Sequence, residues 1–332
     1  MPRFSVIVPV YNRVDEVEDL LKSLSEQTCR DFEVILVEDG STLPCRETAE
    51  KYAGVIDVKY YHKSNEGRSI ARNFGLERAS GDYFIFFDSD CMIPPEYFAT
   101  LSAALDRNNL DCFGGPDAAH VSFSATQKAI NYAMTSFLTT GGIRGGKIQM
   151  EKFVPRTFNM GYSRRVWEKV GGFREMFSED IDMSTRVRQA GFSIGLIREA
   201  YVYHKRRIDF KKFFRQVHVF GMSRITLKLL YPDSLKLVHT LPALAVIIGF
   251  ALVLLSIFLS PWWLTPIGVY LVTLFIDALR QTRSTLIALL ALPAGVIQII
   301  GYGTGFIRAF TTKILFRKGR DINQEIEMRR GK

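Results

Sequence analysis

Two aspartates, one residue apart, are the side chains of this sequence with the clearest chemical use. Asp88 and Asp90 come directly after the apolar run 84–87. A buried strand does not need carboxylates, and open α/β sheets bind ligands at the carboxyl ends of their strands. Paired carboxylates there suit a hard divalent cation and the phosphates that it bridges. Because an ordinary Asp-rich turn gives the same pattern, the neighbouring strand ends have to decide between a ligand site and a turn.

The elements around this pair alternate between strand and helix patterns. We expect strands at 5–9, 32–38, 55–61 and 83–87, and helices at 14–27, 45–52 and 69–78. Apolar strands separated by such helices predict an α/β fold with a mostly parallel sheet that is covered on both faces. Three strand ends carry polar groups, at 11–12, 38–41 and 88–90. Since these ends meet at one edge of the sheet, they favour a ligand site over three unrelated turns.

Two further segments carry groups suited to phosphate binding or proton transfer. Gly67 and Arg68 precede the third helix, where free N–H groups and the helix dipole favour anions. The segment lacks both the G-x-G-x-x-G dinucleotide motif and the G-x-x-x-x-G-K-[ST] motif. Glu179, Asp180 and Asp182 open a later helix. Carboxylates stabilise a helix N-terminus by themselves, and one aimed into the crevice would instead accept a proton from a hydroxyl. The spacing leaves both roles open.

The basic excess of the chain is concentrated around its apolar C-terminal part. The formal net charge is +9, yet residues 1–204 carry 24 basic and 28 acidic side chains. Residues 205–230 carry 8 basic side chains and 1 acidic one, and residues 308–332 carry 8 and 3. Basic segments that flank an apolar region fit anionic lipid headgroups. We therefore expect a membrane surface, and no nucleic acid, as a partner.

The cysteines and the N-terminal stretch predict a reducing compartment and no secretory leader. Cys29, Cys45, Cys91 and Cys112 show no paired zinc-ligand spacing, so we expect reduced thiols. The first apolar stretch, 4–10, is too short for the core of a signal peptide. Membrane insertion is therefore expected from the later segments.

The C-terminal part predicts a helix at the membrane surface, followed by membrane-spanning helices. In 209–231, phenylalanines recur at helical spacing among basic residues, which is typical of an interfacial helix; an ordinary packed helix is the alternative. The stretch 238–260 lacks Asp, Glu, Lys and Arg and is long enough to span a bilayer. Two more spans are expected at 264–279 and 286–310, with the Trp pair of the turn before the second span at the membrane interface.

The positive-inside rule leaves the topology of the last span open. If 205–230 faces the cytoplasm, three full spans put the basic tail outside, whereas a re-entrant hairpin broken at Pro293 keeps it inside. We favour three full spans. Asp277 is expected to pair with Arg280 at the interface rather than to act as a functional intramembrane acid. The N-terminal part is then cytoplasmic, at an inner membrane of bacterial or archaeal type.

These segments divide the chain into four parts. We expect a catalytic domain at 1–205, an amphipathic interfacial helix at 206–232, about three transmembrane helices at 233–310 and a basic tail at 311–332. Within the first part, 111–156 is rich in glycine, which suits either a loop that closes over substrates or a plain surface excursion.

Five groups of residues, taken in order, resemble the motif set of family 2 glycosyltransferases. They are the stretches 6–12, 37–41, 65–67 with 71–73, 88–90, and 171–173 with 179–180. The resemblance covers about residues 3–205. It implies a GT-A fold, which is Rossmann-like with a mostly parallel sheet. It also implies an inverting enzyme that uses a nucleotide-diphosphate sugar with Mg²⁺ or Mn²⁺.

The same resemblance assigns roles to individual residues. It implies Asp180 as the general base and Asp90, Asp88 and His204 as metal ligands, with Asp88 on the ribose side. The donor-binding residues that it implies are Pro9, Tyr11, Glu38, Asp39, Asn65, Gly67, Arg72, Asp88, Ser89, Glu179, His204 and Arg224. Arg224 lies near the place of the Q-x-x-R-W motif of processive relatives, but the segment 223–225 has no Trp, which counts against chain elongation.

Together these features predict a membrane-bound enzyme that transfers single sugars. The expected donor is a nucleotide-diphosphate sugar, with a UDP-sugar first, and the expected acceptor is a polyprenyl-linked saccharide presented at the membrane. A general base favours a sugar hydroxyl over a polyprenyl phosphate that is already ionised. The alternatives are transfer to polyprenyl phosphate, a processive polysaccharide synthase and, from a different class, an inactive membrane scaffold that senses nucleotide sugars.

Overall fold

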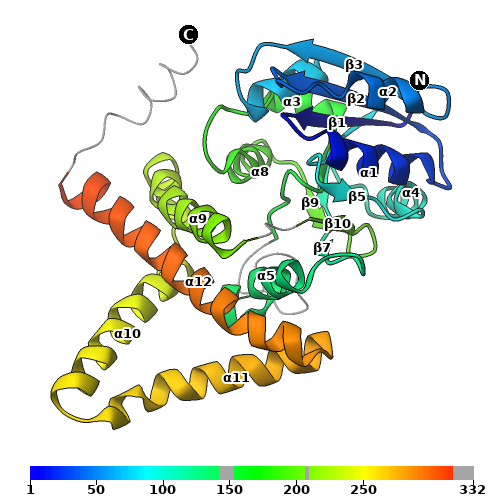
Figure 1. The fold of residues 1–332 in the computed structure, drawn as a ribbon. Coiled ribbons are helices and arrows are strands. Elements are labelled where there is room, and N and C mark those ends of the chain that lie inside the picture. The colour runs from blue at the N-terminus through cyan, green and yellow to red at the C-terminus, as the bar shows by residue number, and fades with distance from the viewer. Residues whose placement is uncertain (142–152, 206–208, 317–332) are drawn as a thin grey trace. The chain divides into compact units, whose positions relative to one another are not determined.

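The computed structural model describes residues 1–141, 153–205 and 209–316, and the chain divides into two compact units (Figure 1). Unit 1 comprises Met1–His120 and Glu151–Lys205, and unit 2 comprises Val121–Met150 and Arg206–Lys332. The second segment of unit 1 ends at Lys205. The segment 121–150, which the sequence-based division places in the catalytic domain, belongs to the unit of the C-terminal helices.

Unit 1 is built on a mixed sheet whose first four strands along the chain lie parallel. In order across the sheet, its strands are β3 (Asp57–Lys63), β2 (Phe32–Asp39), β1 (Phe4–Val10), β4 (Tyr83–Phe86), β8 (Met160–Ser163), β6 (Cys112–Gly114) and β9 (Ile194–Leu196). β1 pairs in parallel with β2 and β4, and β8 lies antiparallel to β4 and β6. The predicted α/β fold with a mostly parallel sheet is confirmed.

The third strand begins at Asp57 rather than at Val55 as predicted. The turn that follows α2 (Arg46–Tyr52) extends further than the apolar pattern indicates. The N–H groups of Val55 and Ile56 both donate to the carbonyl of Tyr52, at 2.9 and 3.0 Å. Their backbones are therefore part of the turn and are not in the sheet ladder.

Helices cover both faces of the sheet, as the continuous apolar strands predict. One face is covered by α1 (Val14–Ser25), α2 and α4 (Tyr97–Asn108), and the other by α3 (Arg68–Leu76), α7 (Arg164–Val170) and α8 (Glu179–Gln189). Successive strand residues alternate between the faces: in β1, Val6 and Val8 pack on the first face and Ile7 on the second, all fully buried. Because both faces need apolar side chains, groups that meet solvent or a ligand gather at the strand ends.

A second, smaller sheet lies within unit 1 and bears directly on the site. Its strands, in order, are β5 (Cys91–Met92), β10 (Val202–His204) and β7 (Asp117–Ala118). The antiparallel pairing of β10 with β5 sets His204 opposite Cys91, and its parallel pairing with β7 sets Val202 opposite Asp117. Residues from the end of unit 1 are thereby brought beside the turn that carries Asp88 and Asp90.

Unit 2 is helical in the residues that the structure describes. Its main helices are α5 (Ala125–Thr135), α6 (Phe137–Thr140), α9 (Phe210–Leu230), α10 (Leu241–Phe258), α11 (Thr265–Thr282) and α12 (Thr285–Ala309). Short helical turns lie at η1 (Pro232–Ser234), η2 (Leu237–His239), η3 (Pro261–Leu264) and η4 (Phe310–Leu315). Among the described residues, three stretches are long and apolar enough to cross a membrane: Leu241–Phe258, Pro261–Thr282 and Thr285–Leu315. α12 lies along α9 and also contacts α5, α10 and α11 (Figure 1).

Two details of the apolar helices bear on the expected topology. α12 continues as a helix through Pro293, so the break that a re-entrant hairpin requires there is not formed. The expected ion pair of Asp277 with Arg280 is wrong. Asp277 instead accepts hydrogen bonds from Tyr132 Oη at 2.5 Å and from Ser136 Oγ at 3.2 Å. These donors lie in and next to α5, a helix that the sequence does not predict.

The aromatic side of α9 packs inside unit 2. Phe213 and Val217 are fully buried in a cluster with Ile130 of α5 and Ala294 of α12. Phe213 therefore does not lie among lipid headgroups, as the interfacial-helix interpretation requires of it. Lys211 and its basic neighbours along the first turns are exposed, and the location of α9 at a membrane surface stays a prediction.

The glycine-rich segment 111–156 is more regular than its composition indicates. It contains β6, β7, α5 and α6. α5 begins with a capping box in which Ser124 Oγ accepts from the backbone N–H of Gln127 while the Gln127 side chain accepts from Ser124 N. Residues 142–152, which include most of the second glycine run, lie outside the described residues, so a closing loop there stays a prediction.

A buried carboxylate in β2 gives unit 1 a pH-dependent stability. Glu33 is fully buried and accepts hydrogen bonds from Ser5 Oγ at 2.6 Å, from Ser80 N at 2.6 Å and from Lys59 Nζ. Burial alone would raise the pKa of Glu33, but these donors outweigh it and lower the pKa to about 2. The ionised form therefore stabilises the fold above the ordinary carboxyl pKa of 4.5, and this contribution disappears as the pH falls toward 2.

We expect Glu33→Gln to lower the free energy of unfolding at pH 7 by about 3 kcal/mol, because each unit of pKa depression contributes roughly 1.4 kcal/mol. The variant should also lose less stability than the wild type as the pH falls from 4.5 to 2. Thermal denaturation of the detergent-solubilised chain across this pH range measures both effects. Superimposable stability profiles of variant and wild type would contradict the prediction.

Candidate active site

Asp39 shapes the loop between β3 and α3 from the end of β2. It is 4% exposed and accepts hydrogen bonds from the N–H groups of Glu66 and Gly67, at 3.0 and 2.8 Å, and from Lys63 Nζ at 2.9 Å. Gly67 has a φ of +99°, a conformation that L side chains rarely adopt, so glycine is needed where the chain enters α3. Asp39 and Gly67, both predicted from the sequence, thus lie in direct contact.

The adjoining strand ends carry further side chains that the sequence predicts. Glu38 is fully buried and accepts hydrogen bonds from Ser41 Oγ and, at 2.8 Å, from Cys45 N. On the β1 side, Tyr11 is 51% exposed, and Asn65 in the loop before α3 is exposed as well. Tyr11 and Asn65 therefore present side chains to solvent at this edge. Glu38 is buried and holds the loop between β2 and α2 through Ser41 and Cys45.

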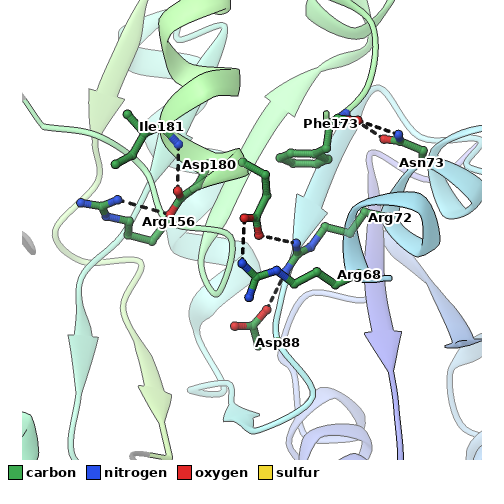
Figure 2. A network of polar contacts seen from close by, with 9 residues as sticks. Arg68, Arg72, Asn73, Asp88, Arg156, Phe173, Asp180 and Ile181 are labelled. Atoms are coloured by element: carbon green, nitrogen blue, oxygen red, sulfur yellow. Dashed lines mark hydrogen bonds and ion pairs between the residues drawn. The ribbon is translucent and has the colours of Figure 1, made fainter. Parts of the chain in front are cut away.

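Arg72 joins the Asp88–Asp90 turn to the start of α8 (Figure 2). Its two terminal amino groups donate to Asp88 Oδ1 at 2.8 Å and to Glu179 Oε1 at 3.0 Å. The Arg72 side chain is 1% exposed and that of Glu179 is 2% exposed. The contact of Arg72 with the nucleotide or diphosphate that the resemblance implies stays a prediction. Arg72 holds Asp88 and Glu179 in place.

The start of α8 places a carboxylate next to this network. Ser178 adopts a left-handed backbone with φ of 66°, which is rare for a residue other than glycine and is characteristic of functional sites. Two residues later, Asp180 accepts a hydrogen bond from Ile181 N at 2.8 Å and forms an ion pair with Arg156 at 3.3 Å (Figure 2). These contacts fix the orientation of the Asp180 carboxylate beside Glu179 at the start of α8.

A carboxylate and an imidazole meet at the other aspartate of the turn. Asp90 Oδ1 lies 3.1 Å from Nε2 of His204. Together with Cys91, these residues place one ligand atom each within 4.8 Å of one another. The His204 ring stacks on Phe158 with centroids 4.7 Å apart, and its Nδ1 is 4.0 Å from the buried carboxylate of Asp117.

This donor set fits a divalent cation. Asp90 offers a hard oxygen ligand and His204 offers an imidazole nitrogen, a combination that suits Mn²⁺ and related ions. A carboxylate beside the second ring nitrogen, as Asp117 is, commonly fixes the orientation of a ligating histidine.

Several predicted residues of unit 1 are linked by contacts, and one predicted residue belongs to unit 2. Asp88 reaches Glu179 through Arg72, and Glu179 precedes Asp180 in the chain. Ser89, between the two aspartates of the turn, is 9% exposed, and Pro9 lies within β1 opposite Val37. Arg224 lies in α9 of unit 2, and its role in donor binding stays a prediction.

Two side chains of the site were not predicted: Arg156, which pairs with Asp180, and Asp117, which lies near His204. Arg68 belongs to the predicted phosphate segment, and its contact with Glu179 Oε2, at 2.8 Å, was not predicted. Arg156 and Asp117 have no local signal, since their partners lie 24 and 87 residues further along the chain.

With this geometry in hand, comparison with known proteins identifies the family. The protein-family model described as "Glycosyl transferase family 2" matches residues 5–171, which is half of the chain. The chain belongs to this family. The GT-A fold is shared with the mannosyltransferase PcManGT of Pyrobaculum calidifontis, which is similar with a TM-score of 0.58 and 18% identity over 96% of this chain and 88% of that one.

Two curated relatives illustrate the range of sequence similarity. The uncharacterized glycosyltransferase YibD of Escherichia coli is 33% identical over 169 residues, which are 51% of this chain and 46% of that protein. Glycosyltransferase AglE of Haloferax volcanii is 25% identical over 256 residues, which are 75% of this chain and 82% of that protein. The chain aligns with less than half of the length of each of the first curated relatives that it matches.

Proposed function

We propose that this protein is a membrane-bound, inverting glycosyltransferase that moves a single sugar from a nucleotide-diphosphate sugar to an acceptor presented at the membrane. The main support is the Asp90–His204 pair next to the Asp88–Arg72–Glu179 network and Asp180 within one unit. Such a set combines a cation site, a helix start suited to phosphate and a carboxylate that accepts a proton.

Mg²⁺ or Mn²⁺ is the proposed cofactor. Asp90, Asp88 and His204 would hold it, and the bound ion would neutralise the charge that develops on the departing diphosphate. The imidazole ligand favours Mn²⁺ over Mg²⁺, which prefers oxygen ligands. The structure of the mannosyltransferase from P. calidifontis is a complex with GDP-Man and Mn²⁺, which supports the same combination of ligands here.

Asp180 is the proposed general base of a direct displacement. The acceptor oxygen forms a bond to the anomeric carbon while the bond from that carbon to the diphosphate oxygen breaks. The electron pair of the broken bond leaves with the diphosphate, and the acceptor's proton passes to Asp180. A single displacement inverts the anomeric configuration. The need for a base favours a sugar hydroxyl, and hence a polyprenyl-linked saccharide, over a bare polyprenyl phosphate.

The helices of unit 2 support a membrane-tethered acceptor. The described residues contain three stretches that are apolar and long enough to cross a bilayer, and exposed basic side chains lie at the start of α9. An enzyme and an acceptor held in the same membrane meet at a raised effective concentration. We place the catalytic unit on the cytoplasmic side, where basic segments are retained and nucleotide sugars are made.

A nucleotide-release assay tests the proposal. The detergent-solubilised chain is offered UDP-, GDP- and dTDP-sugars with a lipid-linked saccharide, in Mn²⁺ or in EDTA. We expect nucleotide release with one donor class, and a UDP-sugar is the first candidate. The rate of release should fall by at least about 99% in EDTA, because the ion contributes several kcal/mol to such transfers. Full release in EDTA would contradict the metal site, and no release with any donor would contradict the enzymatic role. Products longer by one sugar would separate single transfer from a processive synthase.

A further inference from the structure

Arg68 occupies a position in unit 1 that its known contacts do not explain. It is the first residue of α3, and one of its terminal amino groups donates to Glu179 Oε2 at 2.8 Å. Its guanidinium also lies 5.4 Å from the ring centroid of Phe177. These two contacts hold the group in one place, yet 53% of its side chain is exposed. Figure 2 shows Arg68 next to Arg72, with Asp88 close by.

Helix stability does not account for an arginine at this position. The positive end of the helix dipole disfavours a cation in the first turn, and the first turn of α3 contains no acidic residue to offset it. Neutralising Glu179 accounts for it only in part, because the buried Arg72, which Asp88 shares, already pairs with that carboxylate at 3.0 Å. An ion pair with a half-exposed partner adds little to stability. The placement therefore indicates an anion that approaches from solvent.

The surrounding carboxylates favour the charged form of the Arg68 guanidinium. Desolvation alone would lower the pKa of the Arg68 guanidinium, but the charges of Glu179, Asp88 and Asp180 outweigh it and raise the pKa. Arg68 is thus near both Asp88 of the turn and the proposed base, Asp180. Arg68 and Arg72 together face three carboxylates, so these side chains alone provide no excess of positive charge. A cation held by Asp90 and His204 would supply the further positive charge that a diphosphate needs.

We propose that Arg68 is a ligand-facing cation of this site and binds the diphosphate oxygens of the nucleotide-sugar donor. The assignment rests on the proposed function and adds a residue to it. Glu179 and Phe177 preorient the guanidinium, and the planar fork then meets phosphate oxygens with two donors, which a lysine cannot reproduce. Arg72, one helical turn further on, is the buried support beneath it.

Calorimetric binding of UDP and GDP in the presence of Mn²⁺ tests this assignment in the full-length, detergent-solubilised chain. We expect Arg68→Ala to weaken binding of the better nucleotide by roughly 10- to 100-fold, the range for a lost charge-assisted hydrogen bond. Arg68→Lys should lie between wild type and Arg68→Ala. The preference for a nucleoside diphosphate over the corresponding monophosphate should shrink in Arg68→Ala, which a merely structural role would not cause.

Arg78 provides a matched control. It also packs on an aromatic ring, 3.3 Å from the Phe74 centroid, and is 34% exposed, but it lies beyond the other end of α3. Arg78→Ala removes the same charge and should leave nucleotide binding unchanged. Melting temperatures of all variants show whether Arg68→Ala is folded, and Arg68→Gln, of similar length, replaces it if it is not.

The outcomes separate this assignment from the proposed function. If the wild type binds neither nucleotide with Mn²⁺, the proposed donor site is refuted. The assignment of Arg68 to that site is then refuted with it. If the wild type binds and the Arg68 variants bind equally tightly, the assignment of Arg68 alone is overturned. Equal weakening of monophosphate and diphosphate would likewise overturn it, because the loss would then not arise at the diphosphate.

Discussion

Replacing Asp180 with asparagine is expected to lower turnover by roughly 10²- to 10⁴-fold, the range that a general base contributes. The amide keeps the size of the side chain and an acceptor for Ile181 N, which donates to Asp180 at 2.8 Å, but it cannot take the acceptor's proton. Binding of the nucleoside diphosphate with Mn²⁺ should change little, because the base acts only on the acceptor. Nucleotide release at saturating donor and calorimetric binding measure the two quantities separately.

Glu168→Gln is the control for this substitution, since it removes an exposed carboxylate from the neighbouring helix α7. It should retain full turnover. Undiminished turnover of Asp180→Asn would contradict the role of Asp180 and would favour an acceptor that is already ionised, such as a polyprenyl phosphate. A parallel loss of nucleotide binding would instead show that Asp180 supports the donor site.

Replacing Asp90 with asparagine is expected to remove most of the metal-dependent activity. Loss of this charged ligand would leave only Asp88 and His204 to hold the cation, so Mn²⁺ binding should weaken and the developing charge on the diphosphate would be poorly neutralised. Since Lewis-acid stabilisation contributes several kcal/mol, we expect turnover to fall by roughly 10²- to 10³-fold at fixed Mn²⁺. A Mn²⁺ titration of the release assay measures both the maximal rate and the metal concentration that supports it.

Glu77→Gln, which removes a carboxylate with 68% exposure at the end of α3, is the matched control and should leave the Mn²⁺ titration unchanged. His204→Ala should raise the Mn²⁺ requirement less than Asp90→Asn does, because it removes a neutral ligand. An unchanged titration in Asp90→Asn would contradict the cation site and would leave the turn without a catalytic role.

The framework of unit 1 is predictable because each strand is buried on both faces. Continuous apolar runs such as Val34–Val37 of β2, all fully buried, mark the strands, and polar residues at their ends mark the ligand edge. The start of β3 was misjudged because Val55 has a high strand propensity but is 58% exposed in a turn. Local apolar content does not distinguish these two environments.

The site was predictable in its motifs and not in its contacts. The resemblance singles out Asp88, Arg72 and Glu179, but their connection spans 16 and 107 residues of sequence. Whether Arg72 faces a ligand or the interior depends on those partners, and the structure buries it. Arg68, one helical turn before Arg72, is the exposed arginine of this pair.

The helices of unit 2 show the same limit at longer range. The phenylalanines of α9 fit an interfacial helix until α12 is considered, some 80 residues later. α12 offers glycines at the contact: a Cβ at Gly301 would lie 2.4 Å from Val217 Cγ2, and one at Gly305 would lie 1.9 Å from the carbonyl oxygen of His218. These close approaches bury part of the aromatic side of α9. The residue pattern within α9 alone does not predict them.

Pulsed electron paramagnetic resonance of Mn²⁺ bound to the chain, together with the nucleoside diphosphate of the active donor, tests the central claim most directly. The account predicts that a single Mn²⁺ shows hyperfine coupling both to an imidazole nitrogen and to phosphorus. The nitrogen coupling should vanish in His204→Ala, and both couplings should be lost in Asp90→Asn. Phosphorus coupling without any nitrogen coupling in the wild type, or both couplings intact in Asp90→Asn, would contradict a cation seated by Asp90 and His204 on the donor's diphosphate.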